Sequence, residues 1–396
     1  MITFTIAISI GILCGIITGL IPGIHVNLIA TLLIASLPTL LKLTDPLSLS
    51  FFLISLSITH SFLDSIPSIY LGAPDASQAL GVLPGHRYLI NGKGFHAVKL
   101  TLIGSLGAII ISITTLILFS PLILFIVPFL QTYTLYLLIL VVIWMILSDN
   151  NPLIAIIIFT LAGTLGVIVL NSSLSNPLFP MLSGLFGTST LLYSLKENTT
   201  LPEQIISKKI PLNYKLTIHV LAAGAIAGLT TAILPGVGAG IAALFAMLLA
   251  PKMGDYGFMI LIGSINTFNF TYSLLTLTYL EKARNGAVLA ITQIFLPTKE
   301  YLLPYLSTAL IAASISTLLG LILAKKIIHI MQSIPYSTLT ITIILLIVIL
   351  TPFLSGIQGL FILITSTSIG LLTAATKTRR IQNMACIILP VILFLI

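Results

Sequence analysis

Long runs of apolar residues follow one another along almost the whole chain, with short polar stretches between them. A run of about 18 or more apolar residues is long enough to cross roughly 30 Å of hydrocarbon as a helix. The runs occupy residues 2–21, 23–41, 47–71, 97–120, 122–147, 152–170, 178–195, 216–234, 237–250, 257–280, 301–324, 337–353, 355–375 and 381–396. They predict an all-α, polytopic integral membrane protein with about ten to fourteen membrane segments.

Three of these segments are interrupted or preceded by proline and glycine and are short for independent spans. They begin at Gly23 and at Val237, and the third is "NPLFPMLSGLFG" at 176–187. Half-helices or the arms of hairpins suit such segments better than full crossings. The pattern leaves open whether the segments at Gly23 and Val237 cross the membrane or turn back.

Two Pro-Gly breaks share their sequence surroundings. "GLIPGIHVN" (19–27) and "AILPGVGAG" (232–240) lie 213 positions apart. The pairs that coincide at this offset are Pro22 with Pro235, Gly23 with Gly236, Gly11 with Gly224, Gly15 with Gly228, and Ala30 with Ala243. Small residues four apart let membrane helices approach closely. The coincidence predicts two homologous halves, residues 1–200 and 210–396, each with a broken helical hairpin.

A Pro-Gly step ends one helix and lets another begin, because proline lacks a backbone donor and glycine permits unusual dihedral angles. In hydrocarbon, the exposed backbone groups persist only inside protein or beside a watery cavity. The new helices, expected to start at Ile24 and Val237, would direct N–H groups and partial positive charge at an anion. Paired broken helices are typical of a transporter's substrate site. The candidate binding residues are Pro22, Gly23, His25, Asn27, Pro235, Gly236, Gly238 and Gly240. A structural kink at each break is the alternative.

The next apolar segment of each half is unusually polar. "SITHSFLDS" (57–65) contains His60 and Asp64, which share a helix face because they are four residues apart. An ionisable residue inside a membrane segment is a candidate for function. Asp64 is therefore expected to bind a coupling H⁺ or Na⁺ with His60 as its partner, or else the two form a buried packing pair. In "SINTFNFTYS" (264–273), Asn266 and Asn269 are candidate ligands for substrate or ion, with helix–helix hydrogen bonding as the alternative.

Composition agrees with the membrane interpretation. Hydrophobic residues make up 58% of the 396 residues and charged residues 7%, and the mean hydropathy is +1.20. A soluble protein could not cover its surface with so few charges.

The first apolar run has no basic n-region and continues past any cleavage point, so we expect a retained helix. Cys14 and Cys386 lie inside apolar segments, which argues against disulfides and thiolate metal sites. No cofactor is expected.

The net charge of +8 reflects basic clusters in short connections. No basic stripe with interleaved aromatic residues is present, so nucleic acid is not an expected partner. Positive loops stay on the cytoplasmic side. The clusters are Arg87, Lys93 and Lys99; Lys208, Lys209 and Lys215; Lys325 and Lys326; and Lys377, Arg379 and Arg380. Within the first cluster, the loop 75–99 either guides an anion or lipid headgroup toward the pore, or simply anchors the chain.

These features resemble the TctA family, the large membrane subunit of tripartite tricarboxylate transporters, and its shorter archaeal-type members in particular. The resemblance rests on the two Pro-Gly hairpins, on residues 59–101 ("THSFLDSIPSIYLGAPDASQALGVLPGHRYLINGKGFHAVKLT") and on "PLFPMLSGLFG" (177–187), and it covers essentially the whole chain. The matching motif positions are Pro22, Gly23, Pro235 and Gly236, with Gly72, Ala73 and Pro74 near a second conserved loop. Where bacterial members have a glycine-rich "YGGS"-like stretch, this chain has "THSFLDS".

The resemblance implies a multi-pass permease of the cell membrane that moves a small carboxylate anion with H⁺ or Na⁺. It also implies an extracytoplasmic binding protein and a small membrane subunit as partners. A homo-oligomer is compatible with the sequence. An anionic carrier lipid such as a polyprenyl phosphate is an alternative cargo, because its phosphate would suit the same helix N-termini. An intramembrane enzyme fits less well, since an aspartyl protease needs two membrane carboxylates and only Asp64 lies clearly within a span.

Overall fold

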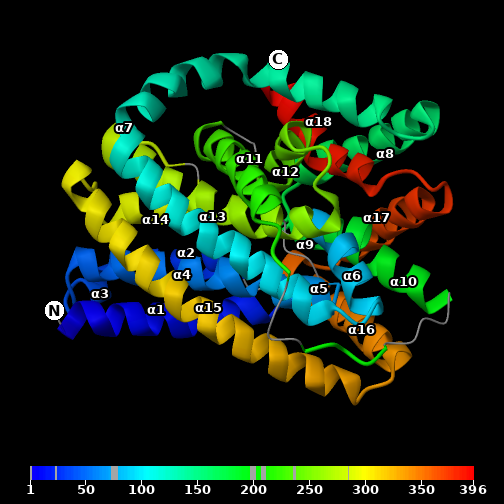
Figure 1. Ribbon diagram of the computed structural model, residues 1–396, viewed down its shortest axis with the longest axis horizontal. Helices are drawn as coiled ribbons and strands as arrows, with labels where there is room; N and C mark the ends of the chain where they lie inside the picture. Colours follow the sequence, from blue (N-terminus) through cyan, green and yellow to red (C-terminus); the bar gives the residue numbers. More distant parts are fainter. Residues whose placement is uncertain are drawn as a thin grey trace.

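The chain folds into a bundle of helices (Figure 1). The computed structural model describes residues 2–22, 25–72, 79–196, 202–206, 211–234, 238–283 and 285–396, and no strand occurs among them. Ten helices of this part of the chain are long and apolar enough to cross a membrane. The prediction of an all-α polytopic membrane protein is confirmed.

Helices up to residue 196 include several short pieces beside the long ones. They are α1 (Ile2–Leu20), α2 (Val26–Ala35), α3 (Leu37–Leu40), α4 (Pro46–Leu63), α5 (Ser65–Tyr70), η1 (Ala79–Gly81), α6 (Val82–Ile90), α7 (Gly94–Leu147), α8 (Pro152–Leu170), α9 (Leu178–Leu182), η2 (Ser183–Thr188) and α10 (Ser189–Lys196).

The remaining helices begin at Tyr214. They are α11 (Tyr214–Ile233), α12 (Ala239–Leu249), α13 (Gly254–Leu280), α14 (Gly286–Ile294), η3 (Lys299–Tyr301), α15 (Leu302–Gln332), α16 (Tyr336–Ser355), α17 (Gln358–Ala375), η4 (Arg380–Met384) and α18 (Ala385–Leu395).

Helix starts and breaks follow local sequence rules. Asp45 accepts a hydrogen bond from the Ser48 backbone N–H at 2.9 Å and so caps α4, with Pro46 in the first turn. The segments expected at 97–120 and 122–147 form the single helix α7, which contains a non-helical residue at Phe119. Phe119 lies two residues before Pro121, whose ring and missing N–H disturb the preceding turn. The expected boundary is therefore a kink.

A stripe of glycines lets α1 lie directly against α4. A Cβ on Gly11 would collide with Ser55 Oγ, and one on Gly15 would lie 2.5 Å from Thr59 Cβ. One turn further, a Cβ on Gly19 would lie 2.9 Å from Leu63 Cβ. The contacts advance in the same direction on both helices, so α1 and α4 are parallel. The chain between them therefore returns toward the side on which α1 begins.

The second half contains the same arrangement. A Cβ on Gly224 would lie 2.5 Å from Ser264 Oγ, and one on Gly228 would collide with Phe268 Cβ. Helices α11 and α13 are therefore parallel as well, and α12 belongs to the returning stretch. Helix α5 is followed by Gly72 (φ +61°), and α13 by Glu281 (φ 54°), so both connections contain a left-handed residue.

Each of the helices α4 and α13 packs along a long helix from the other part of the chain. Ser316 Oγ on α15 donates to Thr59 Oγ1 on α4 at 2.9 Å. Ser105 Oγ on α7 donates to the Gly263 carbonyl of α13 at 2.9 Å. In Figure 1, α4 runs from α3 at the left toward α5, whereas α13 runs from α12 toward α14 at the left. The two predicted halves are thus interleaved.

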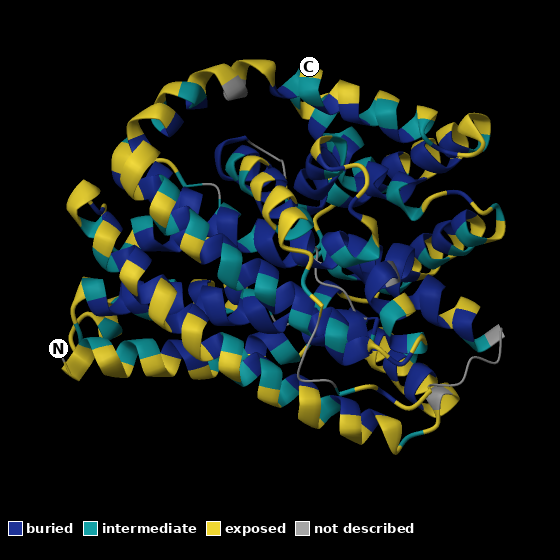
Figure 2. Cartoon of the chain, in the orientation of Figure 1, coloured by how far each residue is buried: buried dark blue, intermediate teal, exposed yellow. Residues whose placement is uncertain are grey.

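Burial separates inner from outer helices. Figure 2 shows α4 and α13 mostly buried, with exposed residues concentrated on the outer helices. On α1, the exposed side chains Ile6, Ile10, Leu13 and Ile17 recur every three or four residues. Exposed apolar stripes on the outside of the bundle are what a helix needs when its solvent is lipid.

Candidate functional site

Helix α2 begins shortly after the first Pro-Gly break. Pro22 is described, whereas Gly23 and Ile24 lie outside the described residues. The helix starts at Val26 and not at the expected Ile24, because His25 is its N-cap and accepts the Asn27 N–H on Nδ1 at 3.1 Å. The imidazole therefore satisfies one of the N–H groups that were expected to face an anion.

His60 connects the hairpin to the crossing helix α4. Its Nδ1 lies 3.1 Å from Thr18 Oγ1, at the last turn of α1, and its ring packs edge-on against that of His25 with centroids 5.1 Å apart. Thr18 and His60 are both buried. The end of α1, the start of α2 and the last turn of α4 thus share one polar cluster.

The second half has a corresponding pair. Asn269 Nδ2 on α13 donates to Thr231 Oγ1, in the last turn of α11, at 2.7 Å. Thr231 follows Thr18 by 213 positions, the offset of the Pro-Gly breaks, and Asn269 lies on α13 as His60 lies on α4. Each hairpin therefore has a threonine before its break that pairs with a polar side chain on the parallel crossing helix.

Asn285 extends the second pair toward the first. Its Nδ2 donates to Asn269 Oδ1 at 3.0 Å, while its own Oδ1 accepts the Ala287 N–H at 3.1 Å and so caps α14. The next residue, Gly286, lies against α2, where an added Cβ would be 2.5 Å from Asn27 Oδ1. The N-termini of α2 and α14 therefore meet.

The groups gathered at this meeting point are of a kind that favours an anion. Both helices start there with no acidic residue in the first turn. Each helix N-terminus carries partial positive charge and backbone donors, and the amides of Asn27 and Asn285 lie beside them. Asn27 is exposed, so a ligand can reach it.

The other predicted residues are placed less closely together. Asp64 is buried, and its backbone N–H donates to the His60 carbonyl at 2.9 Å at the end of α4. Asn266 is half-buried on α13, one turn before Asn269. Gly238 is the N-cap of α12, which begins at Ala239 and not at Val237, and Gly240 is buried in that helix. Pro235 and Gly236 lie outside the described residues.

Many polar side chains of α4 and α13 bond to neighbouring helices or to carbonyls of their own helix. Thr59 accepts a hydrogen bond from α15, and Thr271 donates to Ser112 Oγ on α7 at 2.8 Å. Ser57 and Ser264 donate to carbonyls of their own helices. Among the described residues, no group of three or more His, Cys, Asp or Glu side chains is placed to hold a metal ion.

Sequence reasoning missed three members of the cluster. Thr18 and Thr231 share the 213-residue offset of the breaks, so the repeat would have identified them. Asn285 has no such signal, because its role depends on the approach of α14 to α2.

Comparison with known proteins places the sequence in a family. The family model described as the tripartite tricarboxylate transporter TctA family matches residues 5–385. An uncharacterised protein of Methanocaldococcus jannaschii is 29% identical over 354 residues, which is 87% of this chain and 87% of that protein. No solved structure matches the chain. The match over nearly the whole length, together with the multi-pass helical fold, shows that the chain is a membrane protein of the TctA family of tripartite tricarboxylate transporters.

Proposed function

We propose that the chain is a secondary-type permease that moves small carboxylate anions, with the substrate carboxylate held where α2 and α14 begin. The observation that carries this proposal is the contact between Asn27 and Gly286, which brings two helix N-termini together. Two positive helix ends and two flanking amides favour an anion without the cost of burying a second full charge. Asn266, one turn from Asn269 on α13, is proposed as a further ligand for the substrate.

The proposal includes two inverted repeats, residues 1–200 and 210–396. It is supported by the parallel pairs α1–α4 and α11–α13 and by the matching contacts Thr18–His60 and Thr231–Asn269. Two repeats that contact one another around one site suit alternating access, because one repeat can rock against the other around it.

For ion coupling we assign Asp64 and His60. Both are buried on one face of α4, and His60 contacts the hairpin through Thr18 and His25. A proton or Na⁺ bound at Asp64 would change the charge next to the hairpin, which gives a physical link between ion and substrate. An extracytoplasmic binding protein and a small membrane subunit are the proposed partners, by analogy with the family.

Transport in proteoliposomes tests the proposal. The purified chain is reconstituted and assayed for counterflow of labelled citrate, succinate, acetate and phosphate, with H⁺ and Na⁺ gradients applied separately in uptake assays. Saturable carboxylate counterflow is expected. If carboxylates do not exchange and the chain instead moves a short polyprenyl phosphate between leaflets, measured by phosphatase accessibility, the carboxylate assignment is wrong.

A further inference from the structure

A cavity of about 350 Å³ lies away from the α2–α14 meeting point. It is lined by η1, α6, η2, α10, the end of α12, the start of α13 and the start of η4 with the residue before it. Both predicted halves contribute to it. This volume is within the range of small-molecule sites.

The charges around this cavity are unbalanced. Arg87, Arg379 and Arg380 line it, and Asp255 is the acidic residue among the lining residues. Two positive charges are therefore in excess. Guanidinium groups bind carboxylates and phosphates through paired hydrogen bonds, so the excess favours an anion.

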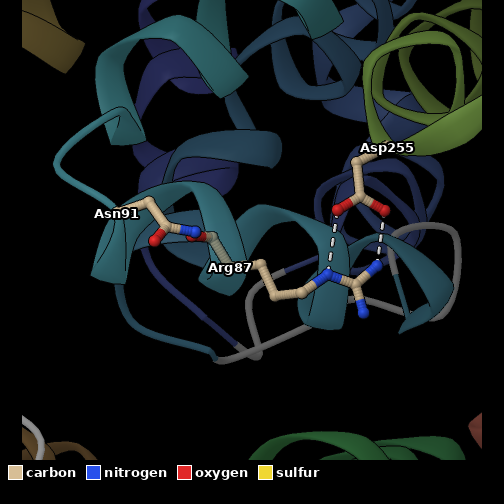
Figure 3. A network of polar contacts seen from close by, with 3 residues as sticks. All are labelled: Arg87, Asn91 and Asp255. Atoms are coloured by element: carbon tan, nitrogen blue, oxygen red, sulfur yellow. Dashed lines mark hydrogen bonds and ion pairs between the residues drawn. The ribbon is translucent and has the colours of Figure 1, made fainter.

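The arginines are held by different contacts. Arg87 forms a two-pronged ion pair with Asp255 (Figure 3), with Nε donating to Oδ2 at 2.9 Å and Nη2 contacting Oδ1. Arg380 Nη1 donates to Ser189 Oγ at 2.9 Å. The backbone N–H of Arg379 donates to Asp149 Oδ2 at 3.0 Å, while its side chain is exposed.

The rest of the wall is mainly apolar. Phe186, Met247 and Phe258 line the cavity together with Leu80 and Val82. A fully hydrated ion such as sulfate would gain nothing from these side chains, whereas an apolar group attached to the anion would bury its surface against them.

We propose that this cavity is a second anion site, which binds a carboxylate or phosphate group joined to an apolar chain. The anion lies against Arg379 and Arg380, and the apolar chain lies against Phe186, Met247 and Phe258. Asp255 competes with the ligand for Arg87, so its carboxylate weakens binding. The site rests on its own lining residues and does not depend on the proposed transport site.

Two sources offer this chemistry, an anionic membrane lipid and a soluble amphipathic carboxylate. The full chain in neutral detergent is titrated with dioctanoyl phosphatidic acid and, separately, with octanoate, and the apparent Kd is measured from the shift in melting temperature. Phosphatidic acid binding alone identifies a lipid headgroup as the ligand. Binding of octanoate identifies a soluble carboxylate.

Three variants test the assignment of residues. Arg379→Ala with Arg380→Ala should weaken binding about tenfold or more, because charge-assisted hydrogen bonds are lost. The control Lys325→Ala with Lys377→Ala removes the same charge outside the lining and should leave the Kd unchanged. Asp255→Asn should tighten binding by severalfold, a gain that a merely destabilised protein cannot show.

Any of three results would overturn the proposal. These are the absence of saturable binding by both probes, an equal loss of affinity in the lysine control, and unchanged or weaker binding by Asp255→Asn. If Arg380→Ala fails to fold, the single variant Arg379→Ala still tests whether the arginines bind the anion. The side chain of Arg379 is exposed, so its removal should not disturb folding.

Discussion

At the scale of single residues, Asp64 differs from the other polar groups of α4 because it is a buried carboxylate near the hairpin. Replacing it by asparagine keeps the size and removes the charge that would hold a proton or Na⁺. We expect gradient-driven uptake by Asp64→Asn to fall about tenfold, the effect of a typical coupling free energy. Counterflow should change little, because it needs no net gradient. Equal loss of both activities would instead indicate a structural role.

His86, on α6 beside the charged cavity, leads us to expect that the stability of the fold depends on pH. Burial and the nearby positive charge of Arg380 lower its pKa to about 4. Between pH 6.5 and 4 the unfolded chain binds a proton at this position that the folded chain does not, so stability falls as the pH falls. At pH 5 the effect is about 2 kcal/mol.

The variant His86→Gln removes this titration. Its apparent melting temperature should therefore fall less between pH 7 and pH 5 than that of the unchanged protein, whatever its absolute value. The comparison is made by thermal unfolding in detergent at both pH values. Identical slopes for the two proteins would contradict a neutral, buried His86.

At the scale of elements, the approach of α11 to α13 depends on Gly224. A Cβ there would lie 2.5 Å from Ser264 Oγ, while its next neighbours are 3.5 Å away. Gly224→Ala should cost about 1–3 kcal/mol through overpacking, measured as a lower melting temperature.

Adding Ser264→Ala removes the clashing oxygen and should recover most of the loss. Gly238→Ala, where no atom lies within 4 Å, is the matched control. Failure of the second substitution to rescue the first would show that this contact does not set the packing.

The sequence predicted the elements better than their meeting points. The Pro-Gly breaks, the glycine stripes and the polar crossing helices are local patterns, and His25, Asn27, His60 and Asn269 were identified from them. The junction of α2 with α14 was not, because residues 27 and 286 are far apart in the sequence and meet only through tertiary packing, in which α14 contacts both α2 and α4. The helix starts predicted at Ile24 and Val237 lie two residues before the observed starts at Val26 and Ala239. For α2 the reason is that an imidazole cap such as His25 has no strong sequence signal.

At the scale of the whole molecule, basic groups from distant segments gather at one end. The cavity brings Arg87, Arg379 and Arg380 together, and Gly94 lies against Ile328 near the end of α15. Lys208 and Lys209 lie outside the described residues. We expect this end to be cytoplasmic.

Orientation can be measured by labelling single cysteines with a reagent that does not cross membranes, after Cys14 and Cys386 are replaced. A cysteine at Lys377 or Lys325 should react only from the inside. A cysteine at Lys299, at the other end of α15, should react only from the outside. Labelling of Lys377 and Lys299 positions from the same side would contradict this topology.

The central claim is that substrate binds where the N-termini of α2 and α14 meet. Its most direct test is counterflow of labelled tricarboxylate in proteoliposomes containing Asn27→Ala or Asn285→Ala, with Asn171→Ala at the exposed end of α8 as the control. Each site variant loses an amide at the proposed anion position, so we predict at least about a tenfold rise in half-saturating substrate concentration, with Asn171→Ala unchanged. Normal half-saturation in both site variants, at matched amounts of folded protein, would contradict the claim.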